Sequence, residues 1–316
     1  PYRQRAAFGV IGESIGGLRH LSDHPPGTSD LPPVRVGISI GDSITGVYAA
    51  LGIVHTHYRH LPDEQLVGQK LLSKAAFHMH QFDPKSMAIA TASTAAAVEQ
   101  DPNNPMALAM YSYALMQSVP LAMSWADDID ADKILSIADK AVQVGQKVDY
   151  AFHNRARIRL WLRRDHQGCR RDAQHALIIN PGFHFAKEDV ALADIFEGNI
   201  ASGVESLGAI VENFPDHPTS PYRMSILSIG YLMLGETKQA LTYALDAYER
   251  KSAIRLHSLA YAAAASGNED LTSTIEFRNM IEQHELTVSD ANRFPFADTD
   301  ATAKLESLLR ATGLPE

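Results

Sequence analysis

The chain has 316 residues, of which 45% are hydrophobic and 21% are charged, and its formal net charge is -9. This composition is ordinary for a folded globular protein and excludes a disordered or fibrous chain. The acidic balance leaves no large basic surface for phosphates, so we expect no nucleic-acid partner. Cys169 is the single cysteine, and no apolar run approaches the ~20 residues that span a bilayer. We therefore expect a cytoplasmic chain with no membrane span and no internal disulfide.

Clusters of glycine and proline mark the first 60 residues, for example at Gly16-Gly17, Pro25-Pro26 and Pro32-Pro33. These residues are typical of turns, loops and short strands. From about residue 62, alanine and leucine at helical spacing replace them. The change in composition predicts two parts, residues 1–61 and residues 62–316.

The second part shows an internal repeat. Apolar residues recur there every three or four positions, as in amphipathic helices. Short polar breaks near Asp165, Gly198, Gly235 and Gly267 interrupt them at intervals of 33, 37 and 32 residues. A unit of ~34 residues is the length of a tetratricopeptide (TPR) helical hairpin. The predicted fold class is therefore mainly α, a TPR-like right-handed α-α superhelix, or solenoid.

The repeat allows a count of about six hairpins. We expect them over residues 66–100, 105–146, 150–180, 183–213, 223–251 and 254–284, followed by a capping helix over 300–311. Small residues such as Ala240, Ala244 and Ala247 stand where two helices must approach closely. Each hairpin has an apolar face that it cannot bury alone, so neighbouring hairpins must stack into one continuous core.

The first helices of such an array line a concave groove, where a protein or peptide partner is expected to bind. The candidates for that surface are Tyr113, Asn154, Arg157, Tyr222 and His257. The acidic net charge favours a basic or mixed partner. The basic run over residues 155–171 indicates either a solvated helix face or a contact with an acidic peptide.

The C-terminal end, with Phe294-Pro295-Phe296 and the final Gly313-Leu314-Pro315-Glu316, resembles a known group of domains. These are the C-terminal TPR domains of bacterial class III adenylate cyclases and of winged-helix transcriptional regulators. The resemblance covers about residues 62–316 and implies a scaffold for protein–protein interaction.

The segment over residues 8–59, with Gly16-Gly17-Leu18 and Gly41-Asp42-Ser43, is similar to an internal part of the family III (CaiB/BaiF) CoA-transferases. The resemblance implies an α/β fold, Asp42 as the catalytic carboxylate and Glu13 as a second acidic residue. An aspartate in that role attacks an acyl-CoA thioester, and coenzyme A returns to form an enzyme-bound thioester.

This segment lacks the CoA-binding domain of that family, and the sequence begins at Pro1 rather than Met. We therefore expect an incomplete transferase segment that is inactive alone, with residues upstream of Pro1. We expect no cofactor, with coenzyme A required only if the transferase interpretation holds.

Other interpretations of the same residues remain open. Asp42 is also suited to cap the helix that follows it, and Gly-Asp-Ser resembles the nucleophile block of GDSL-type hydrolases, with Ser43 as nucleophile. That chemistry needs an aspartate and a histidine, for which only Asp172 and His175 have the spacing. Histidines at 55, 57, 60, 78 and 80 could suggest a metal, but their spacing turns the side chains apart on a helix and no carboxylate or cysteine completes a set. We expect no metal site.

Overall fold

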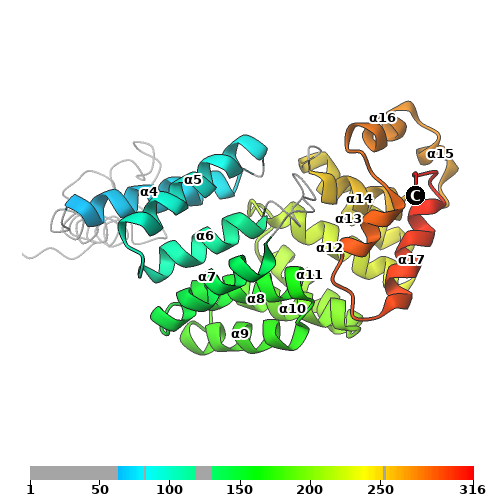
Figure 1. Cartoon of the computed structure of the whole chain (residues 1–316). Helices are drawn as coiled ribbons and strands as arrows, with labels where there is room; N and C mark the ends of the chain where they lie inside the picture. The colour runs from blue at the N-terminus through cyan, green and yellow to red at the C-terminus, as the bar shows by residue number, and fades with distance from the viewer. Residues whose placement is uncertain (1–62, 82, 118–129, 252–253) are drawn as a thin grey trace, which may run out of the picture. The chain divides into compact units, whose positions relative to one another are not determined.

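The computed structural model describes residues 63–81, 83–117, 130–251 and 254–316 (Figure 1). The chain divides into two compact units, Pro1–Val67 and Gly68–Glu316. Nearly all of the first unit, including the expected α/β transferase-like segment, lies outside the described residues. Within the described ranges, every regular element is a helix.

The helices follow one another as antiparallel neighbours. The first five pairs are α4 (Asp63–Met79) and α5 (Pro84–Gln100), α6 (Pro105–Gln117) and α7 (Ala131–Val144), α8 (Asp149–Arg163) and α9 (His166–Ile179), α10 (His184–Glu197) and α11 (Ile200–Asn213), and α12 (Ser220–Leu234) and α13 (Thr237–Arg250). The remaining elements are α14 (Arg255–Ala264), α15 (Glu269–Thr272), α16 (Ile275–Gln283), the 3-10 helix η1 (Val288–Arg293) and α17 (Thr299–Arg310).

The turns inside the hairpins form at the predicted polar breaks. Gly198, Gly235 and Gly267 have φ angles of 113°, 81° and 80°, and Arg164 has a φ of 50°. A left-handed residue ends a helix by satisfying its last carbonyls, and glycine adopts that conformation without strain. Asp165 then starts α9, because its side chain accepts a hydrogen bond from the backbone N–H of Gly168 at 2.8 Å.

Small residues let the paired helices approach closely. Ala240, Ala244 and Ala247 of α13 are fully buried, as their spacing predicted. At Gly203 of α11, an added Cβ would lie 2.6 Å from the backbone oxygen of Ala191 in α10. This contact requires glycine, and it fixes the packing of the α10/α11 hairpin.

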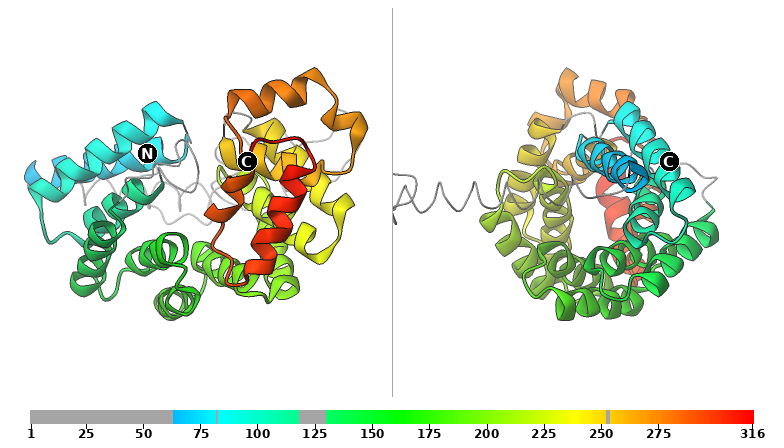
Figure 2. Two further views of the ribbon diagram at one scale, coloured as in Figure 1. Left: turned by 45° about the vertical axis from the view of Figure 1, so that its right-hand side comes forward. Right: turned by 90° about the vertical axis from the view of Figure 1, so that its left-hand side faces the viewer.

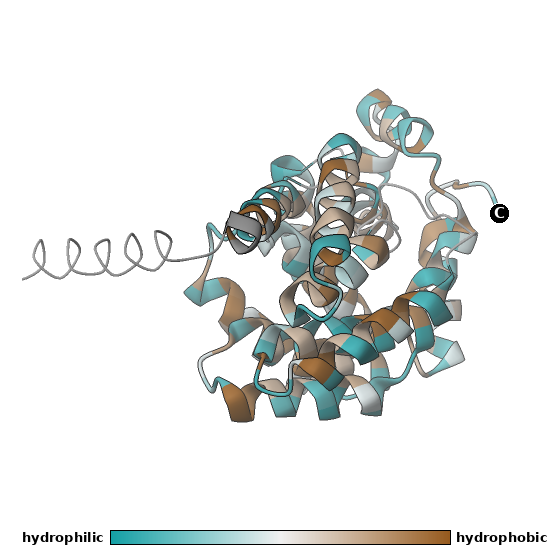
Figure 3. Ribbon diagram, turned by 60° about the vertical axis from the view of Figure 1, so that its left-hand side comes forward, coloured by the Kyte–Doolittle hydropathy of each residue, from teal (hydrophilic) through white to brown (hydrophobic). Residues whose placement is uncertain are grey.

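The first helices α8, α10, α12 and α14 supply half of the buried residues of a continuous core that runs from the second hairpin to the C-terminus. A smaller cluster joins α4, α5 and α6. Figure 2 shows the hairpins following in chain order, and Figure 3 shows apolar and polar faces on the same helices. The predicted fold class, a TPR-like helical solenoid, is confirmed.

Three elements differ most from the expected bounds, and the first is α4, which begins at Asp63 rather than at residue 66. Helix α12 begins at Ser220, three residues before the expected start, because Pro221 is favourable in the first turn of a helix. The second helix of the closing pair is broken into α15 and α16, because the Thr274 hydroxyl caps a new helix by accepting from the N–H of Phe277 at 3.2 Å.

The C-terminal segment returns along the ends of the first helices. The N–H of Ala297 donates to the carbonyl oxygen of Phe196 at 2.8 Å, and Nε2 of His166 lies 2.6 Å from the carbonyl oxygen of Pro295. The rings of Phe294 and Phe196 pack with centroids 6.3 Å apart. The C-terminus therefore closes the core at these ends of α8 and α10.

Candidate functional site

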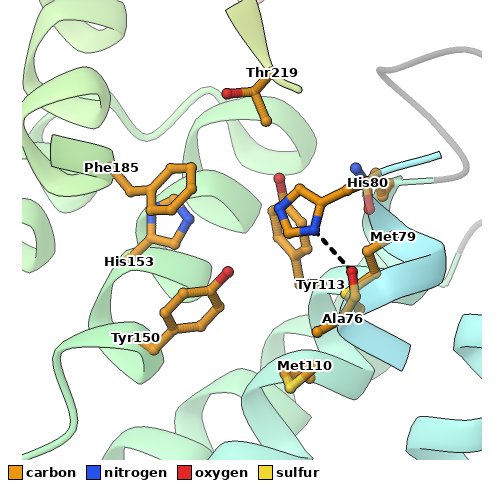
Figure 4. Close-up of a pocket in the computed structure, with 10 residues that line it drawn as sticks. Ala76, Met79, His80, Met110, Tyr113, Tyr150, His153, Phe185 and Thr219 are labelled. Carbon is orange, nitrogen blue, oxygen red and sulfur yellow. Dashed lines mark hydrogen bonds between the residues drawn. The ribbon is translucent and has the colours of Figure 1, made fainter. Parts of the chain in front are cut away.

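A small cavity of about 30 Å³ opens among the first helices, and we call it the inner pocket (Figure 4). Residues of α4, α6, α8 and α10 line it, together with one residue just after α4 and one just before α12. The lining residues are Ala76, Met79, His80, Met110, Tyr113, Gln117, Tyr150, His153, Phe185 and Thr219. Only the stacking of successive hairpins brings these positions together.

Aromatic rings form one wall of the inner pocket. The ring of His153 lies 5.2 Å from the ring of Phe185 in a stacked arrangement and 5.4 Å from the ring of Tyr150 at its edge. The ring of Tyr113 lies 6.0 Å from His153. Burial raises the pKa of Tyr150 to about 12, so its hydroxyl stays protonated and can donate a hydrogen bond.

Beside this wall lies a set of buried charges, the ionic cluster of His153, Arg157, Glu188, Asp189 and Arg223. Arg157 donates from Nη2 to Glu188 and from Nε to Asp189. Nδ1 of His153 lies 2.6 Å from the second Asp189 oxygen, and Nε of Arg223 donates to the second Glu188 oxygen at 2.8 Å. The cluster thus connects α8, α10 and α12.

The ionic cluster holds the Glu188 carboxylate in the charged form. Burial alone would raise the pKa of Glu188, but Arg157 and Arg223 lower it to about 2. Arg157 also donates from Nη1 to the Tyr222 hydroxyl at 3.3 Å. All four carboxylate oxygens and all three nitrogens of Arg157 therefore have partners.

Arg223 differs from Arg157 in this respect. It is 0% exposed, and its Nη1 and Nη2 atoms have no hydrogen-bond partner among the described residues. Both amide atoms of Asn154 are likewise buried without a partner in this part of the chain. Buried polar groups are nearly always satisfied in native proteins, so these atoms are candidates for hydrogen bonds to a ligand or to ordered water.

Three histidines, His80, His184 and His217, lie close to one another, and His80 also lines the inner pocket. His217 has ring neighbours in His184, at 5.4 Å, and His80, at 6.2 Å. Its Nδ1 accepts from the backbone N–H of Thr219 at 3.2 Å. Burial and the nearby charge of Arg223 lower the pKa of His217 to about 4, so this imidazole is neutral at pH 7.

The structure brings together three of the five residues predicted for the groove. Tyr113 lines the inner pocket, while Arg157 and Tyr222 bond to each other beside it. Asn154 is buried in α8. His257 is buried in α14, where its Nδ1 is hydrogen-bonded to the hydroxyl of Ser225. Their role in binding a partner stays a prediction.

Three charged residues of the ionic cluster, Glu188, Asp189 and Arg223, were not predicted from the sequence. The sequence did contain a signal for the two carboxylates. Helix α10 begins 35 residues after α8, and this offset aligns Glu188 and Asp189 with positions of α8 that are buried. Asp189 corresponds in this alignment to Asn154, and Glu188 corresponds to His153. Charged residues at core positions are almost always paired.

The remaining candidate residues lie elsewhere. Asp42, Glu13 and Ser43 fall outside the described residues. Asp172 accepts hydrogen bonds from Arg155 at 2.8 Å and 2.6 Å, and the ring of His175 stacks on Phe152.

The basic run that includes Arg155 is largely paired within the stack. Arg155 and Arg159 both reach Asp172, and Arg170 bonds to Asp194 and Glu197. Much of the positive charge expected on an open helix face is therefore neutralised by neighbouring helices.

The histidines suggested for a metal have other contacts where the structure describes them. Nδ1 of His80 donates to the carbonyl oxygen of Ala76 at 2.8 Å. No group of three candidate ligands gathers among the described residues. None of the helices in the same ranges combines the length and hydropathy needed to cross a bilayer.

Comparison with known proteins gives two different relationships. The model of CoA-transferase family III matches residues 1–155, just under half of the chain. The matched range ends inside α8, so it includes helices α4 to α7 of the stack.

A curated relative, succinyl-CoA–D-citramalate CoA-transferase of Chloroflexus aurantiacus, is 52% identical over 60 residues. That stretch is 19% of this chain and 14% of the relative, so the chain matches only a small part of the relative's length.

Solved structures resemble the helical part. A thermophilic TPR protein of Thermus thermophilus has a TM-score of 0.48 and 16% identity, covering 62% of this chain and 98% of its own. PilF of Pseudomonas aeruginosa has a TM-score of 0.44 and 12% identity, and the match covers 72% of this chain and 93% of PilF. A tetratricopeptide repeat protein of Parabacteroides merdae has a TM-score of 0.40 and 15% identity, and the match covers 78% of this chain and 99% of that protein. These likenesses concern the fold.

Proposed function

We propose that the helical repeat part is a protein-interaction scaffold that binds a peptide segment of its partner at the inner pocket. The observation that carries this proposal is the convergence of Tyr113, Tyr150, His153 and Phe185 from three successive first helices on one cavity. Aromatic side chains around a recess are the usual anchors of protein interfaces, because they give a large contact area at low entropic cost.

A buried polar residue in α8, one position after His153, supports the same function. Asn154 has one free donor group and one free acceptor atom in the described part of the chain, which matches the pattern of a peptide group. A scaffold whose only task was to stack helices would gain stability by placing an apolar residue there.

The test is selection of short random peptides against the purified chain, followed by measurement of the Kd of each synthetic peptide by fluorescence anisotropy. Tyr150→Ala is expected to weaken binding by roughly tenfold or more, since the ring forms part of the pocket wall. The matched control is Tyr243→Ala on α13, whose ring stacks on Tyr231 away from the pocket lining. Equal Kd values for wild type and Tyr150→Ala would contradict the assignment of the pocket.

A second candidate function is acyl-CoA:carboxylate CoA transfer by Asp42, with Glu13 assisting. The observation in its favour is the 52% identity to a succinyl-CoA-dependent enzyme over 60 residues. Incubation of the chain with succinyl-CoA, followed by peptide mass spectrometry, tests it directly. An adduct at Asp42 in the wild type that is absent in Asp42→Asn would establish the nucleophile, and an unmodified Asp42 would count against it.

The finer resemblances belong to the same proposal. We infer that the repeat part is of the kind attached to bacterial class III adenylate cyclases and winged-helix regulators, with the chain acting in the cytoplasm. The resemblance of the C-terminal segment supports the first inference. The free thiol of Cys169, whose pKa is raised by burial, is consistent with the second.

A further inference from the structure

The ionic cluster is complete except at one edge. Its carboxylates, Glu188 and Asp189, have each oxygen engaged, and Arg157 uses all of its nitrogens. Arg223 uses only Nε, so the outer edge of its guanidinium, formed by Nη1 and Nη2, is unpartnered in the described part of the chain. The N–H donors of these two nitrogens are thus buried with no acceptor among the described residues.

The free edge has the geometry of a carboxylate receptor. Nη1 and Nη2 of a guanidinium point in nearly parallel directions and can donate to both oxygens of one carboxylate. A single carbonyl oxygen or a hydroxyl would satisfy only part of this edge. Within the cluster, each oxygen of Glu188 and Asp189 already has a partner other than this edge.

The charge balance of the cluster allows one more anion. Arg157 and Arg223 offset Glu188 and Asp189 one for one, so an incoming carboxylate meets a neutral set rather than a negative one. The local environment therefore accepts an acidic group although the whole chain carries a net charge of -9.

Arg223 is within reach of the inner pocket. Its guanidinium carbon lies 5.8 Å from the ring centroid of Phe185, and that ring also lines the pocket. Phe185 is itself half-buried. The Arg223 charge also acts on His184 and His217, whose rings both contact the ring of Phe185.

We propose that Arg223 binds a carboxylate of the partner, so that the partner of the inner pocket is an acidic peptide segment. This inference rests on the proposed function and specifies its ligand. The carboxylate belongs either to an aspartate or glutamate side chain or to the C-terminus of the partner chain. Both sources present the same two oxygens to Nη1 and Nη2.

The experiment varies the carboxylate on the ligand, which leaves the fold of the protein untouched. A peptide selected by the wild-type chain is synthesised in four forms. Its Asp and Glu residues are either kept or replaced by Asn and Gln, and its C-terminus is either a free carboxylate or an amide. Kd values are measured by fluorescence anisotropy at constant ionic strength. We expect one of the two substitutions to weaken binding by roughly tenfold to a hundredfold, and this arm identifies the source of the carboxylate.

Protein variants then locate the receptor. Arg223→Met is expected to remove the preference for the acidic form, and Arg223→Lys is expected to retain part of it, because an ammonium pairs with a carboxylate without the two-point geometry. Arg170→Met is the matched control, since Arg170 lies on α9 and pairs with Asp194 and Glu197. Circular dichroism and Tm identify any variant that fails to fold. If Arg223→Met does not fold, the Kd values of Arg223→Lys and of the four peptide forms test the assignment instead.

The outcomes separate the two levels of the proposal. If no peptide is selected, the proposed function itself is wrong. If selected peptides bind equally well as acids and as amides, the scaffold function stands and the carboxylate assignment is overturned, with water satisfying Arg223. An acidic preference that survives in Arg223→Met also overturns the assignment.

Discussion

His257 is a buried imidazole in α14 that is hydrogen-bonded to the hydroxyl of Ser225. Burial, with a smaller contribution from Lys251, lowers the pKa of His257 from 6.5 to about 3. The unfolded chain therefore binds a proton at this residue between pH 6.5 and pH 3, and the folded chain does not. Its contribution to stability is complete above pH 6.5 and is lost as the pH falls through that window.

This difference gives a prediction about pH dependence. In His257→Gln, the slope of the free energy of unfolding between about pH 5 and pH 6 should be smaller than in wild type by about 1.4 kcal/mol per pH unit at most. The range from about pH 5 to pH 6 lies above the range in which Glu188 changes its protonation. The pKa of Glu188 is about 2 in the folded chain and 4.5 when the group is free. Urea unfolding at several pH values measures the slope. Parallel curves for the two proteins would contradict the prediction.

The residues of the candidate site were only partly predictable. Tyr113 and Tyr222 could be assigned to first helices because aromatic residues at helical spacing indicate the repeat. Arg223 could not, because a charged residue in a sequence is usually solvated, and for Glu188 the signal lay only in the 35-residue offset between α8 and α10. Their burial depends on pairing between α10 and α12, two helices whose contact is a property of the tertiary fold.

At the scale of single helices and turns, glycine has opposite roles in neighbouring elements. Gly235 closes α12 with a φ of 81°, while Gly208 lies inside α11, and an added Cβ would meet nothing within 4 Å at either position. Any effect of alanine at these sites therefore comes from the backbone. The left-handed position strains an L side chain, whereas the helical position gains from the reduced freedom of the unfolded chain.

We predict opposite shifts from two substitutions of the same kind. Gly235→Ala should lower the free energy of unfolding by about 1 kcal/mol, and Gly208→Ala should raise it by roughly 0.5–1 kcal/mol. Chemical denaturation of the two variants beside wild type is the measurement, and each variant controls for the other. Shifts of the same sign would show that packing rather than backbone conformation decides.

The C-terminal segment is an element whose contacts the repeat pattern did not reveal. Phe294 is fully buried, and its ring centroid lies 6.4 Å from that of Trp161 in α8, which is far earlier in the chain. Phe294→Ala should cost about 3–5 kcal/mol, because it leaves a cavity against Trp161 and Phe196. Phe77→Ala, at a ring that is 64% exposed, is the control and should change stability little. A small loss in Phe294→Ala would mean that the segment closes over the cavity.

Helix boundaries were the most predictable feature at this scale. Glycine turns and proline breaks are local signals, so the hairpins from α8 to α13 begin and end within a few residues of the expected positions. The division of the last second helix into α15 and α16 was not predicted, since Ser and Thr mid-helix compete with the backbone only in some contexts. The path of residues 294–297 was equally hidden, because it depends on contacts far apart in sequence.

For the whole helical array, stability should vary along the chain. In a repeat protein each hairpin is stabilised mainly by its neighbours. The hairpins from α8 to α13 have neighbours on both sides and share one large core with the C-terminal segment. Helices α4 and α5 instead contribute to a separate, smaller cluster with α6, whose buried members are mostly alanine and methionine. Alanine buries little apolar area, so this end gains less from packing.

Hydrogen exchange of the native chain should reflect this gradient. We predict that the amides of α4 and α5 exchange through local opening at lower free energy than the amides of α10 and α12, which should exchange only on global unfolding. Mass spectrometry of peptic fragments over a denaturant series measures both. A ligand bound at the inner pocket touches His80, just after α4, and Phe185 in α10, so binding should slow exchange in α4 most, where opening is easiest. Uniform exchange from α4 to α12 would show that the array unfolds as one cooperative unit and that the smaller cluster is no weaker than the large core.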